Sequence, residues 1–387
     1  MTTPAPLSLY LHWPFCGSKC PYCDFNSHVR PVVDEPRWVK ALLSSLSGWH
    51  AQHSSREIAT IFWGGGTPSL VSPAAVERVL SHIQSLWPIA ADCEITLEAN
   101  PTTHETARFN DLRAAGVNRL SVGIQSFEQA DLDFLGRTYT VTEAERALGH
   151  IAETFPRFTF DMIYALPGHS LGQWQAQLER ALGFAGEHLS LYQLTFEPGT
   201  RFYQALQTGR MQPLDDDTAA DLYAWTLARM AEAGLPQYEI SNYSRPGAES
   251  RHNLVYWQGG EWAGIGPGAH GRIGTNGNRR AIANIRSPEK WLADIEAGKR
   301  GVDSDRPLAP TEVGEELLLT GLRLAKGIDR AAFHSVTGYP LEQTAGPARQ
   351  ARLVAEGLAW SNAKGFGLTA EGLMVLDSAV QFLLDVD

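Results

Sequence analysis

Three of the chain's four cysteines lie close together in the segment Cys16-Gly-Ser-Lys-Cys20-Pro-Tyr-Cys23. Thiolates are the ligands that hold iron–sulfur clusters. Three thiolates on a four-iron cube leave one iron without a protein ligand, and that iron can bind a small molecule. The C-x3-C-x2-C spacing therefore predicts a [4Fe–4S] cluster held by Cys16, Cys20 and Cys23, in a loop directly after the first predicted strand.

A structural zinc site is the alternative use of these cysteines, with His12 or His28 as the fourth ligand. Structural zinc sites usually come as two paired cysteine knuckles, and this chain has one group of cysteines. The fourth cysteine, Cys93, opens a predicted strand and is expected to be a buried small apolar residue. The pattern favours the iron–sulfur cluster.

The elements that must position this loop alternate between strands and helices from residue 7 to about 245. Strands are expected at 7–12, 59–63, 93–98, 119–124, 158–164, 188–195 and 237–241. Several are nearly continuous apolar runs, as expected of parallel strands covered by helices. Repeated strand–helix units predict an incomplete (β/α) barrel of about six units.

Helix punctuation lies between the strands. Ser72-Pro73 is typical of a helix start, and Thr142-Glu-Ala-Glu145 has the form of a capping box. Gly116 and Gly234 each follow an apolar-periodic stretch, as a C-terminal cap would.

The character of the chain changes after the alternating region. Residues 242–285 are rich in Gly, Asn and Arg, which predicts a long structured loop region. We expect residues 1–285 to form the barrel domain and residues 286–387 a smaller, mainly helical domain. Helices at 291–297, 312–324 and 348–356, a short β-turn stretch and a final helix resemble a winged-helix module. This domain is expected to act as a lid or an interaction surface.

Polar residues follow or end several predicted strands. Gly64-Gly-Gly-Thr67 comes after the second strand, where missing Cβ atoms let backbone amides approach a ligand or simply allow a turn. Glu98, Gln125 and Asp161 fall at or near strand ends, which in β/α barrels form the ligand-binding mouth. Each alone would be a loop hydrogen bonder, and Arg137 alone a surface ion-pair residue. Their occurrence on successive strands favours a binding site.

Composition limits the partners and the location. The chain has 387 residues and a net charge of −11, from 32 basic and 43 acidic residues, which argues against nucleic acid. No apolar run approaches about 18 residues, so no transmembrane helix is expected. The first residues do not resemble a signal peptide. Clustered cysteines indicate metal binding in a reducing compartment, which predicts a cytoplasmic protein.

A series of short motifs runs through residues 7–270. The motifs are Tyr10-Leu-His12-Trp-Pro-Phe-Cys16, Cys20-Pro-Tyr22-Cys23-Asp-Phe25, Gly64-Gly-Gly-Thr-Pro68, Glu98-Ala-Asn-Pro101, Gly123-Ile-Gln125-Ser-Phe127, Leu135-Gly-Arg137 and Asp161-Met-Ile-Tyr-Ala-Leu-Pro167-Gly168. Together they resemble the oxygen-independent coproporphyrinogen III oxidase family of the radical SAM superfamily. The resemblance implies that S-adenosylmethionine (SAM) chelates the open iron and that one-electron reduction cleaves it to methionine and a 5′-deoxyadenosyl radical.

Two segments resemble one branch of that family. The oxidase branch carries a fourth cysteine two residues after the third, where this chain has Phe25. Arg251-His252-Asn253-Leu-Val-Tyr256-Trp257 and the glycine-rich segment 264–270 instead match the HemW-type haem chaperones. The resemblance therefore implies a protein that binds haem and hands it to haem-requiring proteins such as respiratory enzymes.

The resemblance also implies roles for individual residues. Tyr10, Gly65 and Glu98 are expected to contact the cluster-bound SAM. The residues at positions around the oxidase's second SAM are Tyr22, Gly66, Thr67, Gln125, Arg137 and Asp161. They bind a second SAM or shape the pocket, and Tyr22 stands where the oxidase has Phe.

His252 is the expected haem contact, because a neutral imidazole is the commonest type of haem ligand. The alternative is that His252 and Asn253 brace their loop against the barrel, with Tyr256 and Trp257 in the core. The expected cofactors are the [4Fe–4S] cluster, SAM and haem.

Three functions compete on this sequence. The first is a haem chaperone that carries a radical SAM cluster, and the second is a coproporphyrinogen III oxidase. A DNA-associated regulator acting through the C-terminal domain is the third. The expected partners are haem, haem-accepting proteins and an electron donor for the cluster. Peripheral membrane contact is left open, and no catalytic residue is assigned.

Overall fold

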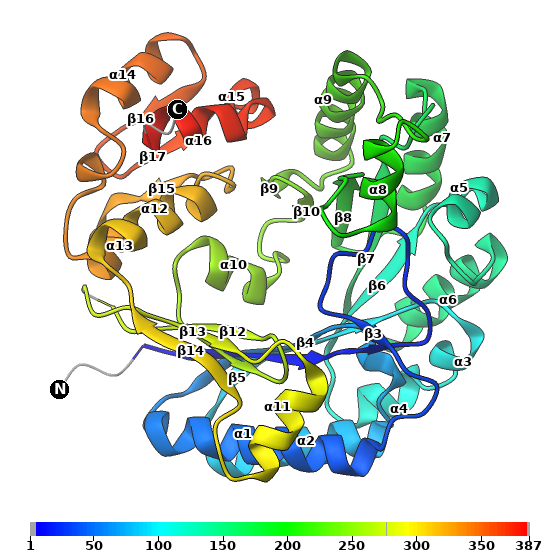
Figure 1. Cartoon of the computed structure of the whole chain (residues 1–387). Helices are drawn as coiled ribbons and strands as arrows, with labels where there is room; N and C mark the ends of the chain where they lie inside the picture. Colours follow the sequence, from blue (N-terminus) through cyan, green and yellow to red (C-terminus); the bar gives the residue numbers. More distant parts are fainter. Residues whose placement is uncertain (1–4, 276, 385–387) are drawn as a thin grey trace.

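The computed structural model describes residues 5–275 and 277–384. Its largest feature is a curved sheet of 12 strands in the order β14-β13-β12-β11-β1-β4-β5-β6-β7-β8-β10-β9 (Figure 1). The strands are β1 (Leu7–Trp13), β4 (Ile58–Gly65), β5 (Ile89–Ala99), β6 (Arg119–Gln125), β7 (Arg157–Tyr164), β8 (His188–Gln193), β9 (Gln237–Glu239), β10 (Asn242–Ser244), β11 (Trp262–Ile265), β12 (His270–Ile273), β13 (Arg280–Asn284) and β14 (Val302–Pro307). The order is linear, so the barrel is incomplete, as predicted.

The middle of the sheet is parallel. The run from β11 through β1, β4, β5, β6 and β7 to β8 pairs in parallel, and the strands at both ends pair antiparallel. Six successive parallel strands, β1 and β4 to β8, are each followed by one or more helices, which confirms the expected number of units. The carboxyl ends of these strands therefore meet at one mouth.

Most helices of this domain line the outer side of the sheet, and α10 (Arg251–Trp257) lies on its inner side (Figure 1). The helices of this domain are α1 (Glu35–His53), α2 (Pro73–Leu86), α3 (Thr103–Thr106), α4 (Phe109–Ala114), α5 (Gln129–Phe134), α6 (Val141–Thr154), α7 (Leu171–Leu182), α8 (Arg201–Gln207), α9 (Asp216–Glu232), α10 (Arg251–Trp257) and α11 (Pro288–Glu296), with a short 3-10 turn at Pro68–Leu70. Ser72 caps α2 by accepting a hydrogen bond from the Ala75 amide, as predicted. The capping box of α6 starts at Thr140, two residues before the predicted Thr142.

Alternating side-chain polarity explains how β1 joins the core. Leu7, Leu9 and Leu11 are fully buried on one face, against the helices. Tyr10 and His12 occupy the other face, on the inner side of the barrel. Apolar and polar side chains are thus separated by the period of the strand.

Two expectations about the chain between 237 and 285 are wrong. The strand at 237–241 does not continue the parallel run, because β9 and β10 pair antiparallel at the edge of the sheet. Residues 242–285 are not mainly loop: they contain β10, α10, β11, β12 and β13. These strands have three to five residues and glycine-rich connections, too short for an apolar period to stand out.

The C-terminal region has its own core. Its helices are α12 (Pro310–Gly321), α13 (Arg330–Thr337), α14 (Pro347–Ala355), α15 (Ala370–Met374) and α16 (Leu376–Leu384), with a 3-10 turn at Leu341–Gln343, and its strands are β15 (Ile328–Asp329), β16 (Ala359–Ser361) and β17 (Gly365–Leu368). The three strands form a separate small antiparallel sheet in the order β15-β17-β16. The expected mainly helical domain with a β-hairpin is confirmed.

The two hydrophobic cores divide later in the chain than residue 285. Trp291 on α11 belongs to the main core and stacks on Trp38 of α1, with ring centroids 6.1 Å apart. Strand β14 continues the large sheet, and the second core begins at Leu308. We therefore propose a boundary near residue 307.

Direct contacts join the domains. The backbone amide of Ala325 donates to the carbonyl of Tyr238 at 3.0 Å, and Arg272 pairs with Glu316 at 2.9 Å. The C-terminal domain is thereby held over the open side of the sheet (Figure 1). None of the helices within 5–275 and 277–384 combines the length and apolarity that crossing a bilayer requires.

Candidate functional site

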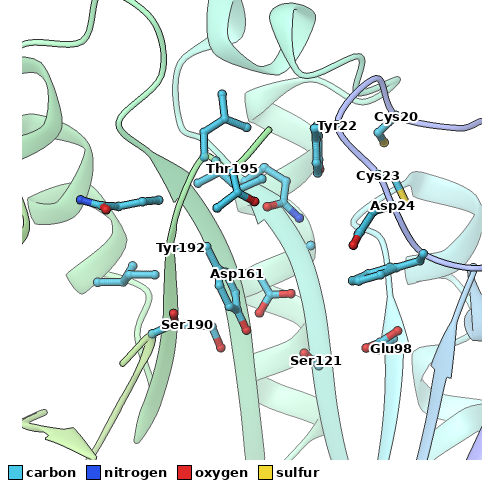
Figure 2. Close-up of a pocket in the computed structure, with 18 of the residues that line it drawn as sticks. Cys20, Tyr22, Cys23, Asp24, Glu98, Ser121, Asp161, Ser190, Tyr192 and Thr195 are labelled. Carbon is cyan, nitrogen blue, oxygen red and sulfur yellow. The ribbon is translucent and has the colours of Figure 1, made fainter. Parts of the chain in front are cut away.

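The cysteine loop is closed at its base by a short parallel pairing. Strand β2 (Phe15–Cys16) pairs with β3 (His28–Val29), and the His28 amide donates to the Pro14 carbonyl at 2.7 Å. This pairing buries Cys16 and leaves Cys20 and Cys23 half-buried farther along the loop. Figure 2 shows Cys20 and Cys23 at the edge of a cavity.

Hydroxyl groups lie beside the thiols. Burial raises the pKa of the Cys16 thiol, and hydrogen bonds to Thr67 and Ser27 partly offset that effect. The Ser27 hydroxyl also lies 3.7 Å from the Cys23 sulfur. Such donors stabilise charged thiolates, so the chemistry of this donor set fits an iron–sulfur cluster.

The zinc alternative finds little support in the histidines. His12 uses both ring nitrogens, with Tyr10 Oη at 2.9 Å from Nδ1 and the Asn26 carbonyl at 2.9 Å from Nε2. His28 Nε2 lies 3.2 Å from Asn26 Oδ1. Within the described residues, no three His, Cys, Asp or Glu side chains converge on one metal ion.

The glycine-rich end of β4 packs directly on the cysteine loop. Gly66 donates its amide to the Trp13 carbonyl at 2.7 Å, and Thr67 donates to the Phe15 carbonyl at 2.9 Å. A Cβ on Gly66 would lie 2.6 Å from the Phe15 oxygen. Gly65 has φ of +116°, and a Cβ there would lie 2.6 Å from the His12 ring. The glycines are therefore required for packing between two loops, in addition to any approach to a ligand.

Two carboxyl groups face the cavity from different strands. Glu98 comes from the end of β5, and one carboxylate oxygen accepts the Gly65 amide at 3.1 Å. Asp161 lies in the middle of β7, earlier than predicted, beside Ser190 of β8. Figure 2 shows both carboxyls directed into the space between the strands.

Burial raises the pKa of both carboxyls toward neutral pH. Burial and the negative charge of Asp161 raise the pKa of Glu98 to about 7, against the lowering effect of the Gly65 amide. Burial raises the pKa of Asp161 to about 6, although Ser190 and two arginines lower it. Both groups therefore change charge near physiological pH.

A second group of polar residues is built around a strained backbone. Gln125 ends β6 with φ of +69°, a conformation that a non-glycine residue rarely adopts. Its side-chain nitrogen lies so close to Gly123 that a Cβ there would be 2.7 Å away. Arg137 approaches the same glycine and also donates to Asn100 Oδ1 at 3.3 Å.

Aromatic rings hold Arg137 in place. Its guanidinium carbon lies 5.9 Å from the Tyr22 ring centroid and 5.8 Å from that of Tyr139. The Tyr139 hydroxyl donates to the Gly123 carbonyl at 2.6 Å. Arg137 is therefore an interior cation and not a surface ion-pair residue.

The three cysteines, the two carboxyls and the group around Arg137 line one cavity of about 1580 Å³. The predicted site residues that line it are Cys16, Cys20, Cys23, Tyr22, Gly65, Gly66, Thr67, Glu98, Gln125, Arg137 and Asp161. Tyr10 and His252 are not among the lining residues. Tyr10 is partly exposed on the inner face of the sheet, bonded to His12 and stacked on Phe62.

His252, the expected haem contact, lies behind the wall of the cavity. Its side chain is 0% exposed, Nδ1 lies 2.7 Å from Thr60 Oγ1, and Nε2 lies 2.7 Å from Tyr256 Oη. Burial lowers its pKa to about 3, with a smaller effect from the charge of Arg119. A haem iron could not reach either nitrogen without breaking these bonds. The bracing alternative fits His252, whereas Asn253, Tyr256 and Trp257 line the cavity.

The sequence reasoning missed several cavity residues. They are Asn100, Tyr139, Ser190, Tyr192, Arg323 and the segment from Leu373 to Ser378. Asn100 and Tyr139 lie within or next to recognised motifs, which could have indicated them. The C-terminal segment carried no signal, because its place at the cavity depends on how the domains dock.

Comparisons with known proteins agree with this geometry. Residues 10–181 match the family model of the Radical SAM superfamily, and residues 308–375 match the HemN C-terminal domain. The latter begins where the second hydrophobic core begins.

Curated relatives match over nearly the whole chain. The protein named Heme chaperone HemW from Escherichia coli (strain K12) is 38% identical over 384 residues, covering 98% of both chains. A protein from Bos taurus named Radical S-adenosyl methionine domain-containing protein 1, mitochondrial, is 38% identical over 393 residues, covering 99% of this chain and 89% of the relative.

A solved structure shares the fold. Coproporphyrinogen III oxidase (HemN) from Escherichia coli superimposes with a TM-score of 0.82, covering 99% of this chain and 91% of that one. The sequence identity is 20%, so this likeness concerns the fold alone.

Proposed function

The chain belongs to the HemW family of the radical SAM superfamily, and from this premise we propose that it is a haem chaperone, which binds haem and delivers it to haem-requiring proteins. In this proposal Cys16, Cys20 and Cys23 hold a [4Fe–4S] cluster whose open iron coordinates SAM. When bound and reduced, the cluster supplies one electron to SAM.

The chain's own residues would bind and orient SAM. Glu98 offers a carboxylate to the amino group of SAM, and the Gly65 amide fixes the direction of that carboxylate. Tyr22 offers an aromatic face and Arg137 a cation beside it. Tyr10 would act indirectly, by holding His12 under the glycine-rich turn.

One observation carries the proposal: the three cysteines and eight other predicted site residues, from six separate segments, meet at a single cavity. Ligand pockets commonly have volumes of about 300–1,000 Å³. A cavity of about 1580 Å³ leaves room beside SAM for a second large molecule.

Partners and location complete the proposal. The cluster requires an electron donor, and the delivered haem requires acceptor proteins such as respiratory enzymes. We propose a cytoplasmic location, on the ground that unpaired cysteines suit a reducing compartment. The Bos taurus relative carries the word mitochondrial in its name, so the compartment can differ between members.

Oxidative decarboxylation of coproporphyrinogen III is the second candidate function. It is favoured by the presence of Tyr22, Gln125, Arg137 and Asp161 at the cavity, the positions that resemble the oxidase's second SAM site. Phe25, which stands where the oxidase branch has a cysteine, favours the chaperone.

Anaerobic reconstitution followed by haem titration tests the proposal. The cluster-loaded protein is expected to develop a saturable Soret band, and Cys20→Ala to lose the brown cluster absorbance and SAM binding. Retained cluster iron in Cys20→Ala would overturn the ligand assignment. A wild-type protein without a Soret change would overturn the chaperone.

A further inference from the structure

The outer part of the cysteine loop exposes apolar side chains to solvent. In the described residues, eight large apolar side chains are exposed, and three of them lie within one stretch of eight positions: Phe25 (59%), Val29 (45%) and Val32 (84%). Pro31, between the two valines, is exposed as well. We call these four residues the loop patch. Exposed apolar residues that lie together on a folded protein commonly mark an interaction site.

The loop patch lies directly beside the cysteines. Val29 of β3 is paired with Cys16 of β2, and Phe25 follows Cys23 by two positions. The patch is therefore one strand pairing or one turn away from the residues that carry the thiols. An electron that arrives at this surface has a short path to a cluster held by the cysteines.

Basic side chains surround the loop patch. Burial and the charge of Arg30 lower the pKa of His28 on β3. The charge of Glu289 opposes this effect, and those of Lys19 and Arg286 add to it. These charged groups therefore lie close together around β3. Arg30 also pairs with Glu289 of α11 at 2.6 Å, and both side chains of this pair are exposed.

The two segments that meet here are more basic than the rest of the chain. Residues 17–40 and 286–300 are joined by the Arg30–Glu289 pair and by a second pair, Arg37–Glu296, also at 2.6 Å. Together they hold eight of the 32 basic residues and six of the 43 acidic residues, in a chain of net charge −11. An acidic partner is therefore attracted to this face and repelled by the net charge of the remaining chain.

We propose that the loop patch, with Lys19, Arg30 and Arg286 at its rim, is the docking surface for the protein that reduces the cluster, a small acidic carrier with its electron on a flavin. This inference rests on the proposed function above, in which the cluster requires an electron donor. The anionic reduced flavin gives up one electron and keeps its proton, the cluster takes up that electron, and no covalent bond forms or breaks. Electron-transfer complexes are weak and commonly bury less than about 1,200 Å², so a few side chains on one loop can hold such a partner.

The residue types favour a flavin carrier over other occupants. The exposed edge of a flavin ring is apolar and matches the valines and the proline, while acidic residues around the flavin match the basic rim. Recognition of anionic lipid headgroups commonly takes about four to eight clustered basic residues, more than this rim provides. A second copy of the chain in a two-fold contact would bring the same basic residues face to face.

Binding of a purified flavodoxin of net negative charge tests the surface, with the cluster-loaded full chain prepared anaerobically. Val32→Asp and Arg286→Glu change two exposed side chains that are not among the residues lining the cavity. Each should weaken flavodoxin binding by about tenfold in calorimetry at low salt. The wild-type affinity should fall between about 0.01 M and about 0.15 M salt, because the screening length shortens from about 30 Å to about 8 Å.

Cluster reduction supplies a second measurement. Reduced flavodoxin should bleach the cluster absorbance about tenfold more slowly in Val32→Asp and Arg286→Glu than in wild type. Dithionite, a small reductant that needs no docking surface, should reduce all three proteins at the same rate. Equal iron content, sulfide content and SAM binding in the three proteins exclude a defect in folding or cluster loading.

Matched controls lie on the C-terminal domain and at the edge of the large sheet. Val354→Asp changes an exposed valine of α14, and Arg245→Glu changes an exposed arginine after β10. Both variants should bind flavodoxin and accept its electron as wild type does.

The outcomes separate the surface from the function. If Val32→Asp and Arg286→Glu bind flavodoxin as well as wild type does, the docking surface is wrong, whether or not the protein binds haem. If flavodoxin does not bind wild type at low salt, the flavin carrier is wrong, and a [2Fe–2S] ferredoxin or phosphatidylglycerol vesicles that bind through Val32 would replace it. A changed oligomeric mass in Val32→Asp with unchanged flavodoxin binding would make the patch a contact between copies. If both variants lose flavodoxin binding and wild type binds no haem, the surface stands and the chaperone falls.

Discussion

Two carboxyl groups decide how the cavity responds to pH. Glu98 and Asp161 have pKa values of about 7 and about 6, mainly because they are buried in the cavity wall. A raised pKa means that the folded protein disfavours the charged form of the carboxyl relative to the neutral form. Folding stability from such a group is fully present below its unfolded pKa and falls as pH rises to the folded value.

Glu98→Gln is expected to separate stability from SAM binding. Ligand-free wild type should lose melting temperature relative to this variant as pH rises from about 4.5 to about 7, because only the wild type ionises there. SAM affinity should change in the opposite direction, because in wild type it rises through pH 7 as the carboxylate forms. In the variant the affinity should stay low, about tenfold weaker than that of wild type at pH 8.

Melting scans and calorimetric SAM titrations at pH 5, 6, 7 and 8 provide the measurement. Equal SAM affinity at all four values in wild type would contradict the assigned role of Glu98.

His252→Leu is expected to damage folding and not haem binding. The substitution removes the imidazole partner of Thr60 and Tyr256. Thr60 keeps its hydrogen bond to Ser8 Oγ at 2.8 Å, whereas the Tyr256 hydroxyl is left unbonded, which should lower the free energy of unfolding by about 1–3 kcal/mol. Urea unfolding should show this loss, while the exposed His104→Leu control should unfold like wild type. A folded His252→Leu protein with greatly weakened haem affinity would restore His252 as the ligand.

Residue types and spacing predicted part of the site directly. The cysteines were identified because three thiols at short spacing have few other uses, and Glu98 and Gln125 because polar groups at strand ends are unusual. The sequence could not distinguish lining residues from residues behind the wall. His252 belongs to the second kind, and its hydrogen bonds to Thr60 and Tyr256 depend on the packed structure.

At the scale of elements, the cluster site is a contact between two loops. The turn after β4 donates two amides to the cysteine loop and has no room for side chains at Gly65 and Gly66. The geometry of Cys16 therefore depends on a turn fifty residues away in sequence.

Gly66→Ala is expected to lower cluster content strongly. Its Cβ would press on the Phe15 backbone, next to Cys16, and backbone atoms cannot yield as a flexible side chain can. Gly17→Ala lies in the same loop with nothing within 4 Å of the added Cβ, so it should load like wild type. Iron and sulfide per chain are the measurement, and equal loading of the two variants would contradict this packing argument.

Element prediction succeeded where apolar runs were long. The six parallel strands from β1 to β8 were expected within a few residues, because buried parallel strands are continuously apolar. Strands β10 to β13 were missed, since each is short and follows glycine-rich sequence. Their pairing is set by β1, β8 and one another, and not by local propensity.

At the scale of the whole molecule, two cores meet around Glu239. This fully buried carboxylate accepts hydrogen bonds from Asn242 and the Ser241 amide and pairs with Arg323 of the C-terminal domain. The pairing links the edge of the large sheet to the wall of the cavity.

Glu239→Gln is expected to loosen the C-terminal domain. The substitution leaves Arg323 without its anionic partner, which should lower the stability of the contact between the domains by roughly 1–3 kcal/mol. Hydrogen exchange should accelerate in residues 308–384 more than in residues 58–125. Glu356→Gln removes a carboxylate from an exposed pair with Arg352, where an effect below about 1 kcal/mol is expected. Uniform acceleration along the chain would contradict a specific domain contact.

The size of the cavity could not be predicted from the sequence. Its second wall is formed by residues 373–378, about 350 positions after the cysteines, and only domain docking brings them together. The sequence indicated a C-terminal lid or interaction surface without indicating which side chains would face the barrel.

Haem titration of the anaerobically reconstituted, SAM-supplied protein tests the central claim most directly, with a coproporphyrinogen III assay run on the same sample. The account predicts a saturable Soret band at one haem per chain and no formation of protoporphyrinogen. Turnover of coproporphyrinogen without haem binding would contradict the chaperone and establish the oxidase instead.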